Sequence, residues 1–263
     1  MDHVRPKKKL GQHFLRDENI ARKIANSIRL NPSGTQILEI GPGTGILTEA
    51  LLALNSSNVR VIEIDPESVV YLRKNFSALD GRILEGDFLS WDISKIFSGK
   101  FIIAGNFPYN ISSQILFRVL EEKDRVEQVV GMFQKEVAKR IASPPGNKEY
   151  GILSVLLRAY YSIEYLFSVN ENVFLPPPKV KSAVIRLLRN QVSRLSCDEK
   201  LFKTVVKTAF NQRRKTLRNA LRKLMDENKV EVSRVPFLEK RAEQLSPDDF
   251  IQLTSAIESF RGK

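Results

Sequence analysis

Short β-branched segments alternate with amphipathic ones from residue 36 to residue 133. The amphipathic segments, near 46–55, 66–77 and 112–120, have the periodicity of helices. This order predicts an α/β fold with a largely parallel sheet and helices on both of its faces. The predicted strands are 36–41, 59–65, 82–88, 101–107 and 126–133, followed by 161–169 and 182–189 as a hairpin-like pair that closes the sheet.

Beyond residue 189 the strand-like segments stop and basic residues accumulate. Residues 31–189 hold 18 basic and 17 acidic residues, whereas residues 190–263 hold 16 and 10. Nine Lys or Arg residues and no acidic residue lie between 200 and 225. We therefore expect a catalytic domain over 1–189 and a small helical domain over 190–263 that docks on a polyanion such as nucleic acid. The alternative is a charged face that only keeps the protein in solution.

The basic segment also has an apolar side. On a single helical wheel Phe202, Val206, Phe210, Leu217 and Leu224 share one face. Because Arg213 falls on that apolar face, we expect the helix to break near Asn211. The opposite face carries the candidate RNA-binding residues Lys200, Lys203, Lys207, Arg214, Arg218 and Arg222.

Cysteine and histidine are scarce, and long apolar segments are absent. Cys197 has no partner for an intrachain disulfide, and with His3 and His13 it is too little for a structural zinc site of the usual type. We therefore expect no metal. No apolar run approaches the roughly 18 residues that span a bilayer, and no apolar signal-peptide core follows the basic N-terminus. We expect a cytoplasmic protein.

A glycine-rich turn, Glu39-Ile-Gly41-Pro-Gly43-Thr-Gly45, follows the first predicted strand. Glycines at this point allow a tight turn and let the backbone approach a nucleotide at the carboxyl edge of the sheet. A dinucleotide fingerprint would place its third glycine where this chain has Ile46. The G-x-G-x-G spacing after an acidic residue favours S-adenosylmethionine over NAD, and a purely structural turn is the alternative.

Acidic residues lie at the ends of the next two predicted strands. Glu63 and Asp65, roughly 20 residues after the glycines, are placed where a carboxylate accepts both ribose hydroxyls of a nucleoside. They share one face of the strand, so only one of them need contact the ribose. Asp87, after Gly86, is placed near an adenine edge. Each carboxylate alone is typical of a solvated strand end, but together they predict a nucleoside pocket.

The motif Asn106-Phe107-Pro108-Tyr109 follows the fourth predicted strand. The exocyclic amine of a base is a poor nucleophile because its lone pair is delocalised into the ring. The Asn106 side-chain oxygen and the Pro108 carbonyl would accept its two N–H groups, and Tyr109 offers a stacking face for a flipped base. The alternative is a strand-terminating turn. Beside a nucleoside pocket, the motif favours alkylation of a base amine.

Seven segments spread over the whole chain carry a resemblance to a known family. They are KKKLGQHFL (7–15), LEIGPGTGILT (38–48), VIEID (61–65), GDFL (86–89), NFPYNIS (106–112), VFLPPPKVKSAV (173–184) and AFNQRRKTLRNAL (209–221). Together they resemble the ribosomal RNA small-subunit adenine dimethyltransferases, the family linked to kasugamycin sensitivity. The resemblance implies a Rossmann-like S-adenosylmethionine-dependent methyltransferase. Its implied substrate is a pair of adjacent adenosines near the 3′ end of the small-subunit RNA, each methylated twice during 30S assembly.

The resemblance also implies roles for individual residues. The catalytic set is Asn106, Pro108, Tyr109 and Phe174, which matches the second aromatic residue at the target base. The chain departs from the family at Phe107, where most bacterial members carry Leu. Contacts to the cofactor fall on His13, Leu15, Gly41, Glu63, Asp87 and Asn106, to which the glycine turn adds Gly43. The first two require the N-terminal segment to fold over the pocket.

Two other functions stay open. A large-subunit RNA adenine methyltransferase of the macrolide-resistance type shares the glycine turn and the Asn-x-Pro-Tyr motif, although the GQHFL opening and the RRKTLRNAL segment disfavour it. A non-catalytic ribosome assembly factor would use the same basic surface, although intact Asn106 and Tyr109 favour activity. We expect a monomer that acts on small-subunit RNA within the immature 30S subunit.

Overall fold

The computed structural model describes residues 4–30, 35–55 and 57–260. The chain divides into two compact units, one of Met1–Ala138 with Ile163–Arg189 and one of Lys139–Ser162 with Asn190–Lys263. Residues 190–263 belong to the second unit. They are joined by 139–162, which the sequence-based division placed in the catalytic domain.

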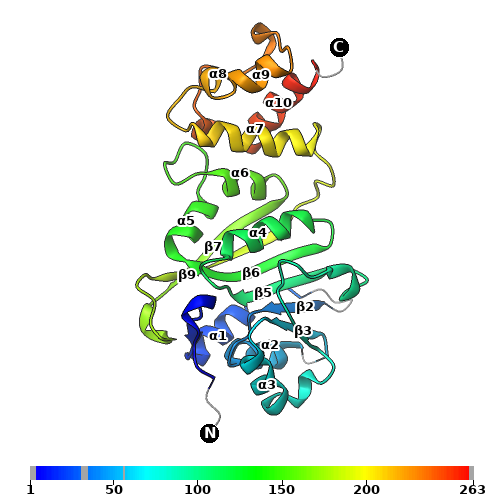
Figure 1. Cartoon of the computed structure of the whole chain (residues 1–263), viewed down its shortest axis with the longest axis vertical. Coiled ribbons are helices and arrows are strands. Elements are labelled where there is room, and N and C mark those ends of the chain that lie inside the picture. Colours follow the sequence, from blue (N-terminus) through cyan, green and yellow to red (C-terminus); the bar gives the residue numbers. More distant parts are fainter. Residues whose placement is uncertain (1–3, 31–34, 56, 261–263) are drawn as a thin grey trace. The chain divides into compact units, whose positions relative to one another are not determined.

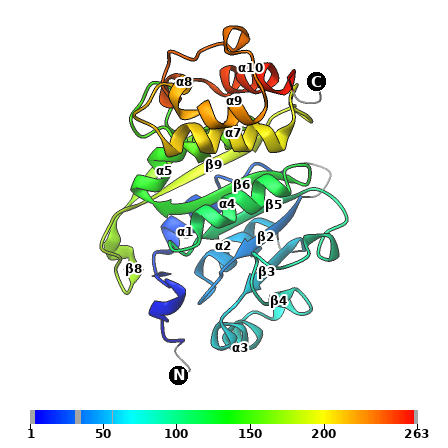
Figure 2. The same ribbon diagram turned by 45° about the horizontal axis from the view of Figure 1, so that its top comes forward.

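The main sheet belongs to the first unit, except for the first two residues of β7, which is an edge strand. Within the described residues its seven strands follow the order β4-β3-β2-β5-β6-β9-β7 (Figures 1 and 2). Strands β2 to β6 pair in parallel and β9 runs antiparallel to β6. The strands are β2 (Gln36–Ile40), β3 (Val59–Glu63), β4 (Ile83–Glu85), β5 (Phe101–Asn106), β6 (Val126–Gln134), β7 (Tyr161–Val169) and β9 (Ser182–Arg189).

The strand order reverses between β2 and β5, because β3 and β4 extend the sheet to one side and β6 extends it to the other. In open α/β sheets a ligand binds beyond the carboxyl ends of the strands at such a point. The predicted parallel sheet is therefore confirmed, and so is the adjacency of 161–169 and 182–189. Strand β4 is shorter than predicted because Gly86, with φ of 154°, turns the chain away.

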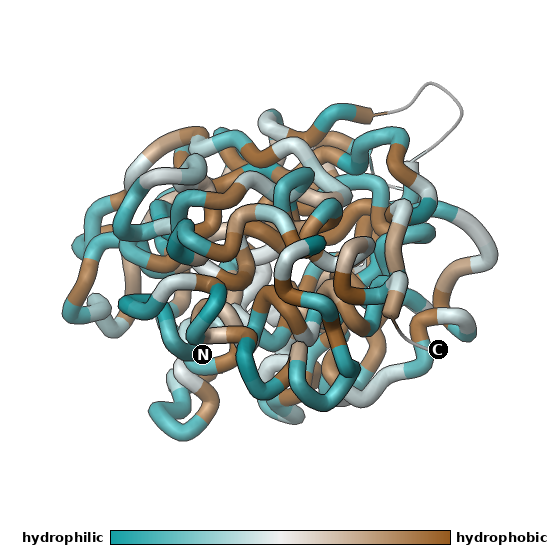
Figure 3. Tube along the Cα trace, turned by 90° about the horizontal axis from the view of Figure 1, so that it is seen from above, coloured by the Kyte–Doolittle hydropathy of each residue, from teal (hydrophilic) through white to brown (hydrophobic). Residues whose placement is uncertain are grey.

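Both faces of the sheet are buried, as expected for helices on both sides. Ile37 and Ile102 belong to the hydrophobic core that also contains residues of the first two helices. Their neighbours Leu38 and Ile103 point to the opposite face and are also fully buried. In Figure 3 brown, hydrophobic stretches alternate with teal, hydrophilic ones along the trace. The helices around this sheet are α1 (Glu18–Ala25), α2 (Ile46–Asn55), α3 (Pro66–Asn75) and α4 (Ser112–Glu121).

The N-terminal segment is attached to the first unit by a small sheet of its own. β1 (Phe14–Leu15) pairs antiparallel with β8 (Phe174–Leu175), so that Leu15 lies opposite Phe174. Before it, residues 8–10 form one 3₁₀ turn that ends at Gly11 in a left-handed conformation. This pairing was not predicted, because two-residue strands carry no periodicity of their own.

The second unit is helical. Its segment 139–162 joins the C-terminal helices because the Tyr150 ring contacts Phe210, which in turn contacts Phe250, each with ring centroids 6.0 Å apart. No helix in the described part of the chain is long and apolar enough to cross a membrane. Besides α5 (Lys135–Ala142), which spans the division between the units, the helices are α6 (Ile152–Arg158), α7 (Glu199–Asn211), α8 (Leu217–Ala220), α9 (Arg222–Glu227) and α10 (Pro247–Glu258).

The predicted break near Asn211 is confirmed, since α7 ends there and Gln212 is its C-cap. Because of this break, the six cations do not share one continuous helical face. Only Lys200, Lys203 and Lys207 lie on α7, whereas the three arginines lie on separate elements: Arg214 in the turn after α7, Arg218 on α8 and Arg222 at the start of α9. The single helical wheel therefore describes only α7, as the predicted break implies.

Candidate active site

A cavity lies at the carboxyl ends of β2, β3 and β5, where the strand order reverses. It contains about 890 Å³ of unfilled space, including the part open to solvent. Parallel strands, the loop after β4 and the N-terminal segment all contribute to its wall, so the N-terminal segment does fold over the pocket. Among the residues predicted for the site, His13, Gly41, Gly43, Glu63, Asp87, Asn106, Pro108 and Tyr109 line this cavity.

The glycine turn between β2 and α2 adopts a backbone that other residues rarely tolerate. Gly41, Gly43 and Gly45 have φ of 69°, 56° and 84°. At Gly43 space is limiting as well, because an added Cβ would lie 2.8 Å from the ring of Phe14. The Phe14 ring therefore packs directly on the turn, which fastens the N-terminal segment to the cavity wall.

Glu63 is the carboxylate at the cavity. Its side chain is buried, and it accepts hydrogen bonds from the backbone N–H groups of Gly43 at 3.1 Å and Asp65 at 2.9 Å. Burial raises the pKa of Glu63, and these two hydrogen bonds oppose that rise. The contacts fix the carboxylate beside the glycine turn with acceptor capacity left for hydroxyl groups of a ligand.

The Asp65 carboxylate has a structural role. It caps α3 by accepting from Glu67 N at 3.2 Å, and it also accepts from Gln12 Nε2 at 3.3 Å and from the ammonium group of Lys7. Burial alone would raise the pKa of Asp65, but the hydrogen bonds from Lys7 and Gln12 outweigh it, so that the pKa is lowered. The Asp65 carboxylate therefore anchors the N-terminal segment through Lys7 and Gln12.

The loop after β4 supplies the next part of the wall. Asp87 lines the cavity and accepts a hydrogen bond from Leu89 N at 2.9 Å through Oδ1. Sequence reasoning missed Ile64, whose side chain lines the cavity although it is 48% exposed. An apolar residue at a strand end offered no distinctive sequence signal for this role. Together the carboxylates and this apolar surface fit a nucleoside, whose ribose is polar and whose base has an apolar face.

Asn106 is held in one orientation. Its Nδ2 donates to the backbone carbonyl of His13 at 2.8 Å. The amide oxygen therefore points away from that carbonyl and is available as an acceptor. The Pro108 carbonyl accepts from Ile111 N at 3.2 Å, which uses one of its two lone pairs. Two acceptors for an amine thus lie close together in the chain at the cavity wall.

Tyr109 is fixed at its ring and at its hydroxyl. The hydroxyl is 2.5 Å from Ser182 Oγ, and the ring stacks on His13 with centroids 5.4 Å apart. Burial raises the pKa of Tyr109, partly opposed by the Ser182 hydrogen bond. His13 Nδ1 lies 2.8 Å from the carbonyl oxygen of Pro176, so this nitrogen donates and carries the proton. One face of Tyr109 is therefore covered by His13.

Two predicted site residues do not line this cavity. Leu15 is buried and borders a second, smaller cavity together with Gly41 and Asn106. Phe174 is 2% exposed and packs in the hydrophobic core with Leu15. The structure therefore does not bring Phe174 to Tyr109 at the cavity surface, and its contact with the target base stays a prediction.

Phe107 is fully buried behind the motif. Its ring contacts Phe133 edge to face, with centroids 5.1 Å apart. A Cβ on Gly131 would lie 2.1 Å from this ring, and a Cβ on Gly105 would lie 2.6 Å from it. The two glycines of β5 and β6 thus provide the space that the Phe107 ring needs.

Of the predicted RNA-binding residues on the second unit, Lys203 is half-buried and the other five are exposed. Arg218 donates twice to Glu239 Oε1, at 2.8 and 2.5 Å, and Arg222 lies 3.9 Å from Asp226. Lys207 lies on α7 and Arg214 in the following turn. Glu239 and Asp226 are themselves exposed, with side-chain exposures of 75% and 71%. Arg218 and Arg222 therefore keep access to an anionic ligand.

Comparison with known proteins gives a consistent result. The family model of ribosomal RNA adenine dimethylase matches residues 4–259. The chain is 54% identical over 260 residues to ribosomal RNA small subunit methyltransferase A of Phocaeicola vulgatus, covering 98% of this chain and 92% of the relative. It is also 54% identical over 257 residues to the protein of the same name from Cytophaga hutchinsonii, covering 98% and 99%.

Solved structures agree. A dimethyladenosine transferase from Plasmodium falciparum superposes with a TM-score of 0.81 at 26% identity, covering 94% of this chain and 98% of that one. The 23S rRNA methyltransferase ErmE superposes with a TM-score of 0.69 at 25% identity, covering 93% and 99%. With the family model spanning nearly every residue and the cavity built from the motifs of the resemblance, the chain belongs to the ribosomal RNA adenine dimethylase family.

Proposed function

We propose that this protein transfers methyl groups from S-adenosylmethionine to the exocyclic amines of two adjacent adenosines near the 3′ end of small-subunit ribosomal RNA, giving dimethyladenosines. The observation that carries the proposal is the orientation of Asn106. The hydrogen bond from Nδ2 to the His13 carbonyl leaves the side-chain oxygen at the cavity as an acceptor. An amine needs such an acceptor when its lone pair is drawn out of conjugation.

Residues of the glycine turn and the two neighbouring strands would hold the cofactor. Glu63 would accept from the ribose hydroxyls, Ile64 would pack on the adenine and Asp87 would accept from the adenine edge. S-Adenosylmethionine supplies an electrophilic methyl group on a sulfonium sulfur. No strong base is required in this arrangement, because the amine becomes acidic once its nitrogen is alkylated.

The chain's own residues then act by positioning. Asn106 Oδ1 and the Pro108 carbonyl hold the amine, and the exposed face of Tyr109 receives the base. The hydrogen bond between Tyr109 and Ser182 and the stack on His13 restrict the ring before substrate arrives. Less ordering is then needed on binding, which favours reaction.

The substrate class separates this proposal from the large-subunit alternative. The 54% identity to two small-subunit methyltransferases, against 25% to ErmE, supports small-subunit RNA. The basic residues Lys207, Arg214, Arg218 and Arg222 would bind RNA phosphates of an immature 30S subunit. We propose a cytoplasmic monomer, since an extended basic surface on a polymeric substrate requires no second copy.

The test replaces Asn106. Asn106→Ala should leave cofactor and RNA binding largely intact and lower single-turnover methylation by roughly 100-fold or more, the typical cost of one preorganised transition-state contact. The matched control is Asn75→Ala, which removes an exposed amide at the end of α3. Near-wild-type rates in Asn106→Ala would disprove its contact with the amine.

The same assay identifies the substrate when labelled cofactor is offered with immature small subunits, naked small-subunit RNA and large subunits. We expect methylation of adjacent adenosines in small subunits. Methylation of large subunits instead would favour the macrolide-resistance type, and binding without methylation would favour a non-catalytic assembly factor.

A further inference from the structure

The loop between β4 and β5 packs its tryptophan onto the backbone next to Asp87. A Cβ added to Gly86 would lie 2.2 Å from Trp91 Nε1 and 3.1 Å from Cδ1 of the same ring. The indole therefore occupies the space that any side chain at residue 86 would take. The backbone N–H of Trp91 donates to the backbone carbonyl of Asp87 at 3.2 Å. Movement of Trp91 would consequently displace Asp87 at the cavity wall.

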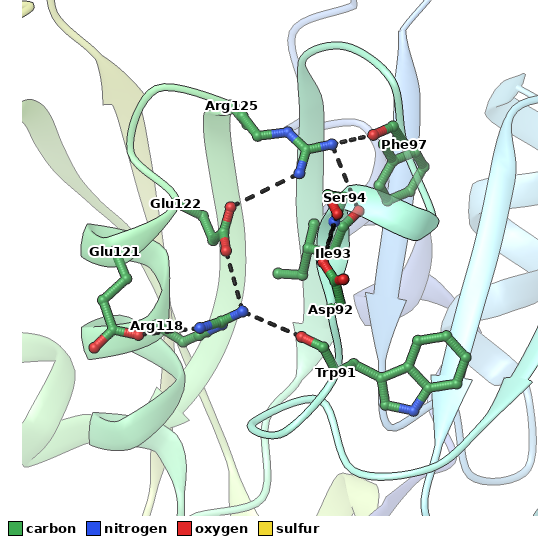
Figure 4. Close-up of polar contacts among 9 residues, drawn as sticks. All are labelled: Trp91, Asp92, Ile93, Ser94, Phe97, Arg118, Glu121, Glu122 and Arg125. Atoms are coloured by element: carbon green, nitrogen blue, oxygen red, sulfur yellow. Dashed lines mark hydrogen bonds and ion pairs between the residues drawn. The ribbon is translucent and has the colours of Figure 1, made fainter.

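An arginine on α4 holds Trp91 in place. Arg118 donates to the Trp91 carbonyl at 3.1 Å (Figure 4). The same guanidinium is fixed by Glu121 at 3.2 Å and by Glu122 at 3.1 Å. The Arg118 side chain is only 24% exposed, so this charged group is partly desolvated and its hydrogen bonds are stronger than at a free surface.

A second arginine completes the network farther from the cavity. Arg125 lies 3.9 Å from Glu122 and donates to the carbonyls of Ile93 and Phe97 (Figure 4). Its side chain is 25% exposed, which nearly equals that of Arg118. The two arginines thus share a carboxylate and a degree of burial, but only Arg118 contacts the residue that packs on Gly86.

Helix α4 also reaches the other side of the active site. At its start, Ile111 N donates to the Pro108 carbonyl at 3.2 Å and Ser112 Oγ donates to the Tyr109 carbonyl at 3.1 Å. The helix therefore contacts the Asn106–Tyr109 motif at one end and the Asp87 loop, through Arg118, toward its other end. One rigid element holds both walls of the cavity.

We propose that Arg118 and Trp91 are positioning residues for cofactor binding: Arg118 fixes Trp91, and the indole on Gly86 sets Asp87 against the adenine edge. This inference rests on the proposed placement of S-adenosylmethionine in the cavity. It predicts that cofactor affinity depends on Arg118 of α4. The described contacts of its side chain are with Glu121, Glu122 and the Trp91 carbonyl.

The chain contains one tryptophan, so intrinsic tryptophan fluorescence reports on Trp91 alone. S-Adenosylmethionine should change this emission, with half-saturation at the Kd that calorimetry gives. Arg118→Gln should raise the Kd for S-adenosylmethionine by about tenfold, the effect of losing one charge-assisted hydrogen bond. The matched control Arg125→Gln removes the same charge beside Glu122 and should change the Kd by less than about twofold.

Thermal unfolding of both variants separates positioning from stability. The proposal expects similar losses in Tm but a raised Kd in Arg118→Gln only. Equal increases in Kd for both variants would overturn it, because the network would then act through stability alone. Cofactor binding without any change in Trp91 emission, and with the Kd of Arg118→Gln unchanged, would overturn it and leave the proposed function intact. Absence of cofactor binding to the wild-type protein would overturn both.

Discussion

Replacing the buried Glu39 by Gln should make the stability of this protein much less dependent on pH. Glu39 lies on β2 directly before the glycine turn and is 1% exposed. Its Oε2 accepts from Thr48 Oγ1 at 2.6 Å. Burial raises the pKa of Glu39 to about 8, the Thr48 hydrogen bond opposes this rise and the neighbouring Glu63 adds to it. The side chain is therefore protonated in the folded protein at neutral pH.

The magnitude follows from the difference between the two states. In the unfolded chain the carboxyl releases its proton near its ordinary pKa of 4.5, whereas the folded protein keeps the proton until about pH 8. The contribution of Glu39 to the free energy of unfolding is thus fully present below pH 4.5 and is lost as the pH rises to about 8. At about 1.4 kcal/mol per pH unit, the loss is on the order of 5 kcal/mol in the free energy of unfolding.

Urea unfolding between pH 5 and 9, without cofactor, measures this effect. Gln retains the shape and can still accept from Thr48, but it cannot ionise. The free energy of unfolding of Glu39→Gln relative to wild type should therefore rise with pH and level off above about pH 8. Glu49→Gln, at an exposed position on α2, serves as control and should keep a constant difference. A constant difference for Glu39→Gln as well would refute the reasoning.

Two further predictions concern the carboxylates and the basic surface. Glu63→Ala should weaken S-adenosylmethionine binding in calorimetry, whereas Asp65→Ala should mainly lower Tm, because Asp65 caps α3; the reverse result would exchange their roles. Replacing Arg214, Arg218 and Arg222 by Glu should weaken subunit binding and flatten its salt dependence with cofactor affinity unchanged. An unchanged salt slope in titrations at several salt concentrations would identify these residues as a solvated face.

Local sequence signals predicted the sheet because its strands are rich in β-branched residues. Its middle strands, such as β2 and β5, are buried on both faces. The end of α7 at Asn211 followed from the position of Arg213. What the sequence did not reveal depends on contacts between distant segments. The pairing of Leu15 with Phe174 and the packing of Tyr150 on Phe210 are examples, since neither leaves a periodic pattern.

In the candidate site, too, local motifs could be predicted from the sequence and contacts between distant segments could not. The glycine turn and the Asn106–Tyr109 motif are local, so their residue types alone indicated their chemistry. The choice between Glu63 and Asp65 depended on which carboxylate the rest of the chain engages, and Lys7 and Gln12 engage Asp65 from more than 50 residues away. Ile64 escaped notice because an apolar residue at a strand end has no distinctive sequence context.

The departure at Phe107 has a physical counterpart elsewhere in the sheet. Gly131 lies on β6 and has no left-handed φ, so its backbone does not require glycine. Space does require it, because a Cβ there would lie 2.1 Å from the Phe107 ring and 2.8 Å from its Cδ2. The ring and the missing side chain therefore form a complementary pair directly behind Asn106 and Pro108.

Gly131→Ala should consequently destabilise the protein by about 1–3 kcal/mol, the usual cost of overpacking a core. Phe107→Leu should also destabilise it, because the smaller side chain leaves a cavity. In the double variant the added methyl group would occupy space that the ring vacated, so the loss should be smaller than the sum of the two single losses. Urea unfolding of all four proteins measures this coupling. If Gly131→Ala costs the same with Phe107 as in the Phe107→Leu background, the ring does not account for the glycine.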